Sequence, residues 1–224
     1  KSRIIIFIAA IVLLIPSVLG YLHTRVNYDI LSYLPEDIET MKGQDILVDE
    51  FGTGAFSTFV VDGMSNKDAS ALKAKIEDVD HVKAVLWYDS VADITNPTDM
   101  LPEKMQKVFL SDEGTLMFIL YDTTMSADET MEAVEQIRAI SNEQCFLSGM
   151  SAVVTDIRDL SDKEVPVYVL LAVILSLVVL SLTMDSFLIP IFFLMSIGMA
   201  IIYNLGTNVF MGEISYVTKA LSAV

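Results

Sequence analysis

The stretch VPVYVLLAVILSLVVLSLTM, residues 165–184, decides how the rest of the chain is interpreted. It holds no charged residue and no glycine, and its one proline, Pro166, stands second. About twenty apolar residues rising ~1.5 Å each in a helix cover ~30 Å, the hydrocarbon thickness of a bilayer. Such a helix is apolar on every side, and in lipid it satisfies its own backbone groups. The stretch therefore predicts a membrane span.

Three further segments have the same character. Residues 1–22 contain a first span with the apolar run 4–22, residues 187–205 form a third, and residues 214–224 begin a fourth. A cleaved signal peptide is the alternative for the first run, but no small-x-small site follows it. Lys1 and Arg3 favour a cytoplasmic N-terminus, which places residues 23–164 outside the cytoplasm of a multi-pass plasma-membrane protein.

Charge is segregated along the chain. Of 30 acids and 14 bases in all, residues 22–164 hold 28 acids and 11 bases, a net charge of −17. Such a domain is a poor partner for nucleic acid or anionic headgroups. Cys145 is the single cysteine, and the only histidines are His23 and His81, so neither a disulfide nor a metal or cofactor site is expected. Without a Ser/His/Asp arrangement or a phosphate-binding loop, we do not expect an enzyme.

The acidic domain shows two β-α-β patterns separated by an insert. An amphipathic helix is predicted from Ser65, which opens a capping-box-like start, and another from Ser126, which opens a full capping box. An earlier helix is predicted to open at Pro35. The insert carries a short helix at 105–110, and the predicted strands cover 56–62, 82–88, 115–121 and 144–148. The predicted fold is therefore an α+β membrane protein, with transmembrane helices and an extracytoplasmic ferredoxin-like (βαββαβ) domain.

In its ordered set of segments the chain resembles the resistance-nodulation-division (RND) superfamily of exporters, specifically its MMPL (mycobacterial membrane protein large) branch. The segments that carry the resemblance are Tyr28–Asp37 running on to Phe51–Gly52, the β-α-β domain, Ser148–Ala152 leading to Asp156–Ile157, and Gly212–Thr218. The resemblance covers essentially the whole chain and implies the N-terminal part of a longer, proton-driven exporter of lipids or other hydrophobic or amphipathic compounds. It implies a bilayer, protons and an amphipathic substrate as partners, and it is compatible with a homo-oligomer.

In that family the coupling acids lie midway along the fourth span, and we expect them beyond Val224. No Asp, Glu, Lys, Arg or His lies within 4–22, 165–184 or 187–205. Candidate residues lining a substrate path in the porter-like domain are Phe51, Phe56, Phe59 and Met64, with ordinary core packing as the alternative.

Other functions remain open. One is the permease subunit of an ATP-driven complex with a large ectodomain, and another is a protein-translocon accessory factor of the same superfamily. Asp156, Asp159 and Asp162 could bind a divalent cation, although a solvated helix face is the simpler interpretation. Ser196 and Gly198 are expected to permit close helix approach in the third span.

Overall fold

The computed structural model describes residues 2–29, 31, 34–35, 37–52, 54–90, 101–111, 114–184 and 186–221. The chain divides into two compact units, Lys1–Tyr28 with Arg158–Val224 and Asp29–Ile157. We call them the helical unit and the sheet domain. Three sequence predictions fall outside the described residues: Glu36 as an acid in the first turn of the helix predicted from Pro35, a loop around Pro97, and a tight turn at Asp185.

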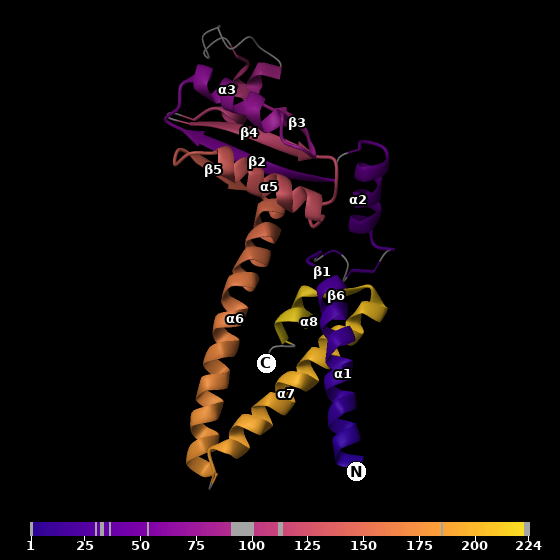
Figure 1. The fold of residues 1–224 in the computed structure, drawn as a ribbon. Coiled ribbons are helices and arrows are strands. Elements are labelled where there is room, and N and C mark those ends of the chain that lie inside the picture. Colours follow the sequence, from indigo (N-terminus) through magenta and orange to yellow (C-terminus); the bar gives the residue numbers. More distant parts are fainter. Residues whose placement is uncertain are drawn as a thin grey trace. The chain divides into compact units, whose positions relative to one another are not determined.

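The sheet domain is built on four strands joined by two β-α-β connections (Figure 1). The first connection comprises β2 (Ala55–Asp62), α3 (Asn66–Glu77) and β3 (Val82–Leu86), and the second comprises β4 (Gly114–Tyr121), α5 (Asp128–Ile140) and β5 (Cys145–Ser148). The strands stand in the order β3-β4-β2-β5, and every neighbouring pair is antiparallel. The two strands of each connection are therefore not neighbours, because β4 lies between β2 and β3, and β2 lies between β4 and β5.

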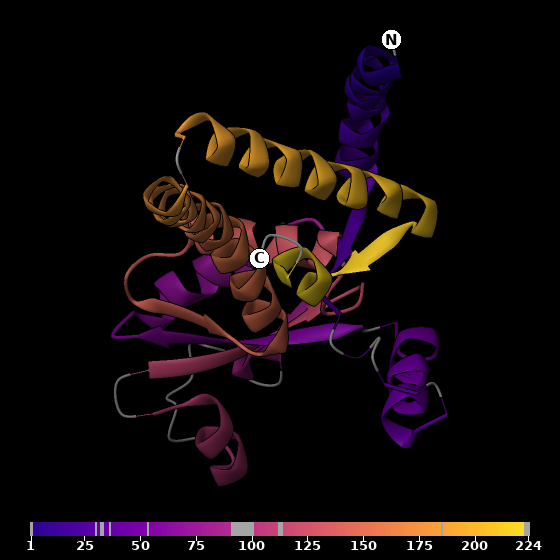
Figure 2. The same ribbon diagram turned by 90° about the horizontal axis from the view of Figure 1, so that it is seen from below.

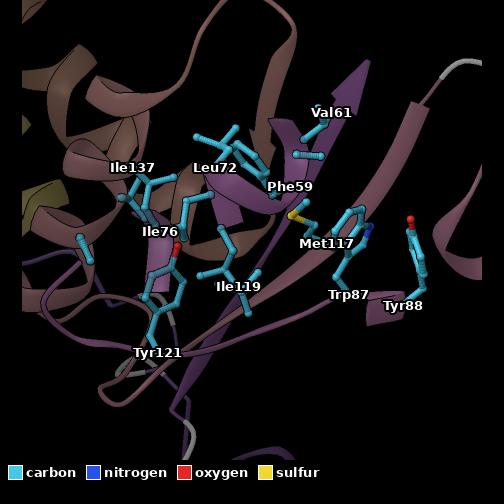
Figure 3. Packing of buried hydrophobic residues seen from close by; sticks show 14 of the residues in the cluster. Phe59, Val61, Leu72, Ile76, Trp87, Tyr88, Met117, Ile119, Tyr121 and Ile137 are labelled. Carbon is cyan, nitrogen blue, oxygen red and sulfur yellow. The ribbon is translucent and has the colours of Figure 1, made fainter. Parts of the chain in front are cut away.

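One face of this sheet packs under α3 and α5. Alternate side chains of β2 and β4 point to that face, as the two-residue repeat of a strand requires, and Phe59 and Ile119 are fully buried there. They meet Leu72 and Ile76 of α3 and Ile137 of α5 in one apolar cluster (Figure 3). Each such side chain contributes about 1.5–3 kcal/mol on burial, so this cluster is the main source of the domain's stability.

The opposite face of the sheet is apolar as well, but it is exposed. Phe56 and Val60 of β2 and Phe146 of β5 keep 57%, 38% and 57% of their surface. They alternate with buried residues in β2 and with partly buried residues in β5, so apolar side chains occur on both faces of the sheet. Large exposed apolar patches mark contact surfaces in soluble domains.

Two further helices belong to the sheet domain. They are α2 (Glu39–Asp49), which buries none of its residues, and α4 (Glu103–Phe109), between β3 and β4, with a 3-10 turn at Tyr88–Ser90. The prediction that a helix opens at Pro35 is wrong. Pro35 closes a separate turn with Ile38, whose extended backbone (ψ 153°) interrupts the helical path before Glu39.

The two predicted capping boxes have different outcomes. The Ser65 prediction is confirmed, because its hydroxyl accepts a hydrogen bond from the Asp68 amide at 3.2 Å. The Ser126 prediction is wrong. Ala127 is the N-cap of α5 and makes no side-chain cap, while Ser126 is buried one residue earlier.

Among the residues that the structure describes, three helices are long and apolar enough to cross a membrane: α1 (Ser2–His23), α6 (Met150–Thr183) and α7 (Leu188–Thr207, continued to Met211 by a 3-10 turn). Their apolar side chains are exposed on nearly all sides, which suits lipid as the surrounding medium. Helix α6 is continuous, so the acidic segment before residue 165 and the predicted span 165–184 share one helix as far as Thr183. Its first residues, to Ile157, belong to the sheet domain, and the remainder belongs to the helical unit.

Within the helical unit α1 crosses α7 (Figures 1 and 2). The glycines Gly20 and Gly206 lie at the contact between these two helices. A Cβ atom added to Gly206 would lie within 3.0 Å of backbone atoms of Ser17, and one added to Gly20 would meet the Gly206 carbonyl oxygen. The Tyr203 hydroxyl, about one turn before Gly206 in α7, donates to the Ala10 carbonyl near the middle of α1. Gly198 has nothing within 4 Å of its Cβ position, so the helix contact predicted there lies instead at Gly206.

A short parallel pair joins the chain after α1 to the chain after α7. Strand β1 (Arg25–Asn27) pairs with β6 (Glu213–Ser215), and α8 (Tyr216–Leu221) follows directly. The Asn27 side chain donates to the Glu213 carboxylate at 2.9 Å. This pair fixes the start of the predicted fourth span beside the end of the first.

Candidate functional site

An apolar pocket lies in the sheet domain at the start of β2, with a volume of about 320 Å³. We call it the Phe56 pocket. Helix α2, strands β2 and β4 and the first turn of α6 all contribute to it. Its lining residues are Gln44, Leu47, Gly54, Ala55, Phe56, Leu120, Met125, Met150 and Ser151.

The two polar side chains in this lining are engaged by the backbone. Gln44 Nε2 donates to the Gly54 carbonyl at 2.7 Å, and Ser151 Oγ donates to the Phe56 carbonyl at 3.3 Å. The remaining side chains are aliphatic, aromatic or thioether, and methionine adapts its shape to irregular apolar partners. Phe56 and Met150 are each at least half exposed. The pocket can therefore take an apolar group, and it offers no charged partner to a ligand.

The structure separates the four predicted path-lining residues. Phe56 lies in the pocket, whereas Phe51 is 63% exposed and is absent from the pocket lining. Phe59 is fully buried and Met64 packs against the same cluster, which agrees with the core alternative for these two. The strand period explains the difference, because Phe56 and Phe59 are three residues apart and so face opposite sides of β2.

A second group of side chains lies in the helical unit. Lys219 Nζ of α8 is 2.5 Å from Asp162 Oδ1 of α6 and donates to the Tyr28 hydroxyl at 3.3 Å. The ammonium also lies 5.9 Å from the centroid of the Tyr28 ring. We call Tyr28, Asp162 and Lys219 the Lys219 cluster.

Tyr28 is held firmly in this cluster. It is 5% exposed, and its ring stacks on Tyr216 with centroids 6.0 Å apart and planes 15° apart. Burial raises the pKa of the Tyr28 phenol above its ordinary value of 10.0, although the adjacent Lys219 opposes the rise. The phenol is therefore neutral at physiological pH and accepts the lysine's hydrogen bond without adding a negative charge.

Lys219 is not among the predicted site residues, because it lies in residues 214–224, where the predicted fourth span only begins. Its residue type is nevertheless a signal in the sequence, since any ionisable residue in a predicted span is a candidate for function. Leu47, Met125 and Met150 are overlooked for another reason. They come from three separate segments, and only the folded domain brings them beside Phe56.

The alternative of a cation site on the acidic helix is not supported by the described residues. Asp156 pairs with Arg138 at 2.7 Å, and Asp159 lies 3.5 Å from Arg158. Asp162 pairs with Lys219. No group of three potential metal ligands occurs among the described residues.

These features define a membrane protein in which an α+β domain of mixed helices and antiparallel strands accompanies several apolar spans. The chain matches the model of the MMPL family over residues 32–224 and belongs to that family. MMPL proteins are membrane transporters of the RND type, which fits a bilayer environment and hydrophobic substrates. No curated protein matches the sequence.

Proposed function

We propose that this chain is the N-terminal part of an exporter that uses the proton-motive force to move lipids or other amphipathic compounds. In this proposal the sheet domain is a ferredoxin-like porter domain outside the cytoplasm, and the Phe56 pocket contacts the apolar part of the substrate. The observation that carries the proposal is an apolar pocket of about 320 Å³ in a strongly acidic domain.

The composition of the pocket favours this class of substrate. Its volume is at the lower end of small-molecule sites, so it suits one apolar segment of a larger amphiphile. Each methylene group removed from water contributes about 0.8 kcal/mol, so a segment of a few carbons binds weakly and can be released. Weak, reversible binding is what a carrier requires of its substrate.

The energy source is proposed from the resemblance to RND exporters. The described parts of α1 and α7, and α6 from residue 165 on, carry no Asp, Glu, Lys or Arg apart from Arg3 at the start of α1. A coupling acid is therefore expected midway along the fourth span. An uninterrupted apolar fourth span would count against proton coupling and would favour the ATP-driven permease.

The proposal is tested with the full-length protein in proteoliposomes that contain a fluorescent phospholipid as the transported probe. We expect an imposed pH gradient to drive transport, and a protonophore to abolish it without any need for ATP. Transport that requires ATP and a partner ATPase, and that ignores the protonophore, would refute the proposed energy source.

The role of the pocket is tested with Phe56→Asp, because a charge in an apolar pocket must be desolvated when substrate enters. We expect about a tenfold loss of transport. Phe146→Asp is the matched control, since Phe146 is equally exposed on the same sheet face but lies outside the pocket lining. Equal losses in the two variants would remove the pocket from the proposal.

Orientation is tested by labelling cysteines from outside intact cells. Asp62→Cys and Glu129→Cys are both exposed positions of the sheet domain, and each is made in a Cys145→Ser background. A membrane-impermeant maleimide is expected to label both. Labelling only after the cells are opened would place the domain in the cytoplasm.

A further inference from the structure

The Lys219 cluster connects three segments that are far apart in the sequence. Tyr28 follows β1, Asp162 lies in α6 and Lys219 lies in α8. The parallel pairing of β1 with β6 and the Tyr28–Tyr216 stack already hold two of these segments together. The Lys219–Asp162 ion pair adds α6 to them.

Helix α6 has a weak point one turn beyond this ion pair. Pro166 lacks an N–H group, so the carbonyl of Asp162 loses its usual partner four residues later, and proline rings bend helices at such positions. Asp162 therefore provides both the carboxylate of the ion pair and the carbonyl that Pro166 leaves without its usual helical donor.

The structure also leaves room for α6 to move at this point. A cavity of about 310 Å³ lies beside Pro166, and its lining includes Asp162, Val169 and Lys219 together with Ile201 and Leu205 of α7. Helices α1 and α7 are in backbone contact at their glycines, whereas few close contacts join the described parts of α6 to α1 or α7. The ion pair links α6 to α8 within the helical unit.

We propose that Asp162 is a positioning residue for transport, and that the Asp162–Lys219 ion pair is a latch that holds the start of the fourth span against α6 and opens when α6 bends at Pro166. The opening step rests on the proposed transport function. The pair itself can be tested without transport.

The exposure of the pair suits a contact that opens and closes. The Asp162 side chain keeps 52% of its surface and Lys219 keeps 23%, so water can replace either partner as they separate. Half-exposed ion pairs contribute little net stability. A pair buried in apolar surroundings would resist separation far more strongly.

The pair is tested first by charge reversal in the full-length protein, with the apparent Tm in detergent as the readout. We expect Asp162→Lys to lower the Tm by about 2–6 °C, because it replaces attraction by repulsion. In a Lys219→Asp background the same substitution is expected to raise the Tm, because opposite charges meet again. In the control background Lys163→Asp, which reverses an exposed neighbour on α6, it is expected to lower the Tm as before.

A Tm that falls on Asp162→Lys in every background would overturn the proposal, because the sign would then not depend on Lys219. This result does not involve transport. A failure to observe transport by the wild-type protein would refute the proposed function and leave the Tm comparison valid.

Opening is tested with Asp162→Cys and Lys219→Cys together, in the Cys145→Ser background. A short bifunctional methanethiosulfonate joins the two thiols, and a reductant releases them. We expect bridging to lower transport at least about tenfold, and reduction to restore it. Transport at the unbridged rate while the thiols are joined would overturn the opening step.

If the double-cysteine variant does not transport before bridging, the charge-swapped variant Asp162→Lys with Lys219→Asp tests whether transport depends on the ion pair. It is expected to transport at no less than about half the wild-type rate, while each single reversal loses at least about fivefold. A swapped variant as inactive as the single reversals would overturn the proposal.

Discussion

Adding one methyl group at Gly206 is expected to separate α1 from α7. The new Cβ of Gly206→Ala would lie within 3.0 Å of the carbonyl oxygen, the Cα and the carbonyl carbon of Ser17. All three are backbone atoms, so no side-chain rotation relieves the overlap. Either the two helices move apart or their backbones distort.

The expected cost follows from what the separation disturbs. Overpacking a well-packed interface typically costs about 1–3 kcal/mol. Moving the helices apart also weakens the hydrogen bond from the Tyr203 hydroxyl to the Ala10 carbonyl, worth about 1 kcal/mol. The total is about 2–4 kcal/mol, or a Tm lowered by about 5–10 °C for a chain of this size.

The matched control is Gly198→Ala on the same helix. Its Cβ meets nothing within 4 Å, so no overlap arises. Alanine also favours a helix by about 1 kcal/mol over glycine, so this Tm is expected to stay constant or rise slightly. Thermal unfolding in one detergent, followed by a fluorescence size-exclusion assay, compares the two variants. Equal Tm values for Gly206→Ala and Gly198→Ala would refute the backbone contact at this crossing.

Three further predictions concern the sheet domain. Ser65→Ala removes the cap on α3 and is expected to lower the free energy of unfolding by about 1 kcal/mol, whereas Ser126→Ala removes no cap from α5; denaturant unfolding compares the two. Tyr121→Phe is expected to lower the free energy of unfolding by about 1 kcal/mol at neutral pH, because the buried phenol donates to Ser57 at 3.2 Å. The buried Tyr88 hydroxyl has no partner among the described residues, so Tyr88→Phe is expected to be neutral or stabilising. Burial raises the pKa of the Tyr121 phenol above its ordinary 10.0, so the native state keeps this proton to a higher pH than the unfolded chain does. The free energy of unfolding of the wild type is therefore expected to fall as pH rises above about 10, and that of Tyr121→Phe to fall less. Unfolding curves from pH 8 to 11 measure both.

Where local chemistry decides the structure, the sequence was sufficient. An uncharged, mostly apolar run of twenty residues satisfies its backbone in lipid as a helix, and residues 165–183 lie in one continuous helix that ends at Thr183. β-Branched and aromatic runs became strands, because each run is short and flanked by turn residues. Ser65 became a cap because its hydroxyl needs only the amide of Asp68, three residues away.

Where a choice depends on distant residues, the sequence could not decide. Ser126 satisfies the same local pattern as Ser65, yet the chain buries it and begins the helix after Ala127. Gly198 and Gly206 look alike in an apolar helix, and only the path of α1 determines which of them touches it. For the same reason, the sequence could not tell which substrate-path candidates lie in the pocket and which lie in the core. The face of the sheet to which an apolar strand residue points is known only when the sheet and its covering helices are known.

The acids of α6 show how helix geometry resolves an ambiguity that spacing alone leaves open. Residues three apart are separated by about 300° around a helix, which is equivalent to a backward turn of about 60°. Asp156 and Asp162 are therefore about 120° apart, too far around the helix for their carboxylates to converge on one cation. That divergence lets Asp156 reach Arg138 of α5 within the sheet domain, while Asp162 reaches Lys219 of α8 within the helical unit. One helix thus makes an ion pair in each unit, and because these contacts are separate, reversing the charge of Asp156 should leave the Lys219 latch unchanged.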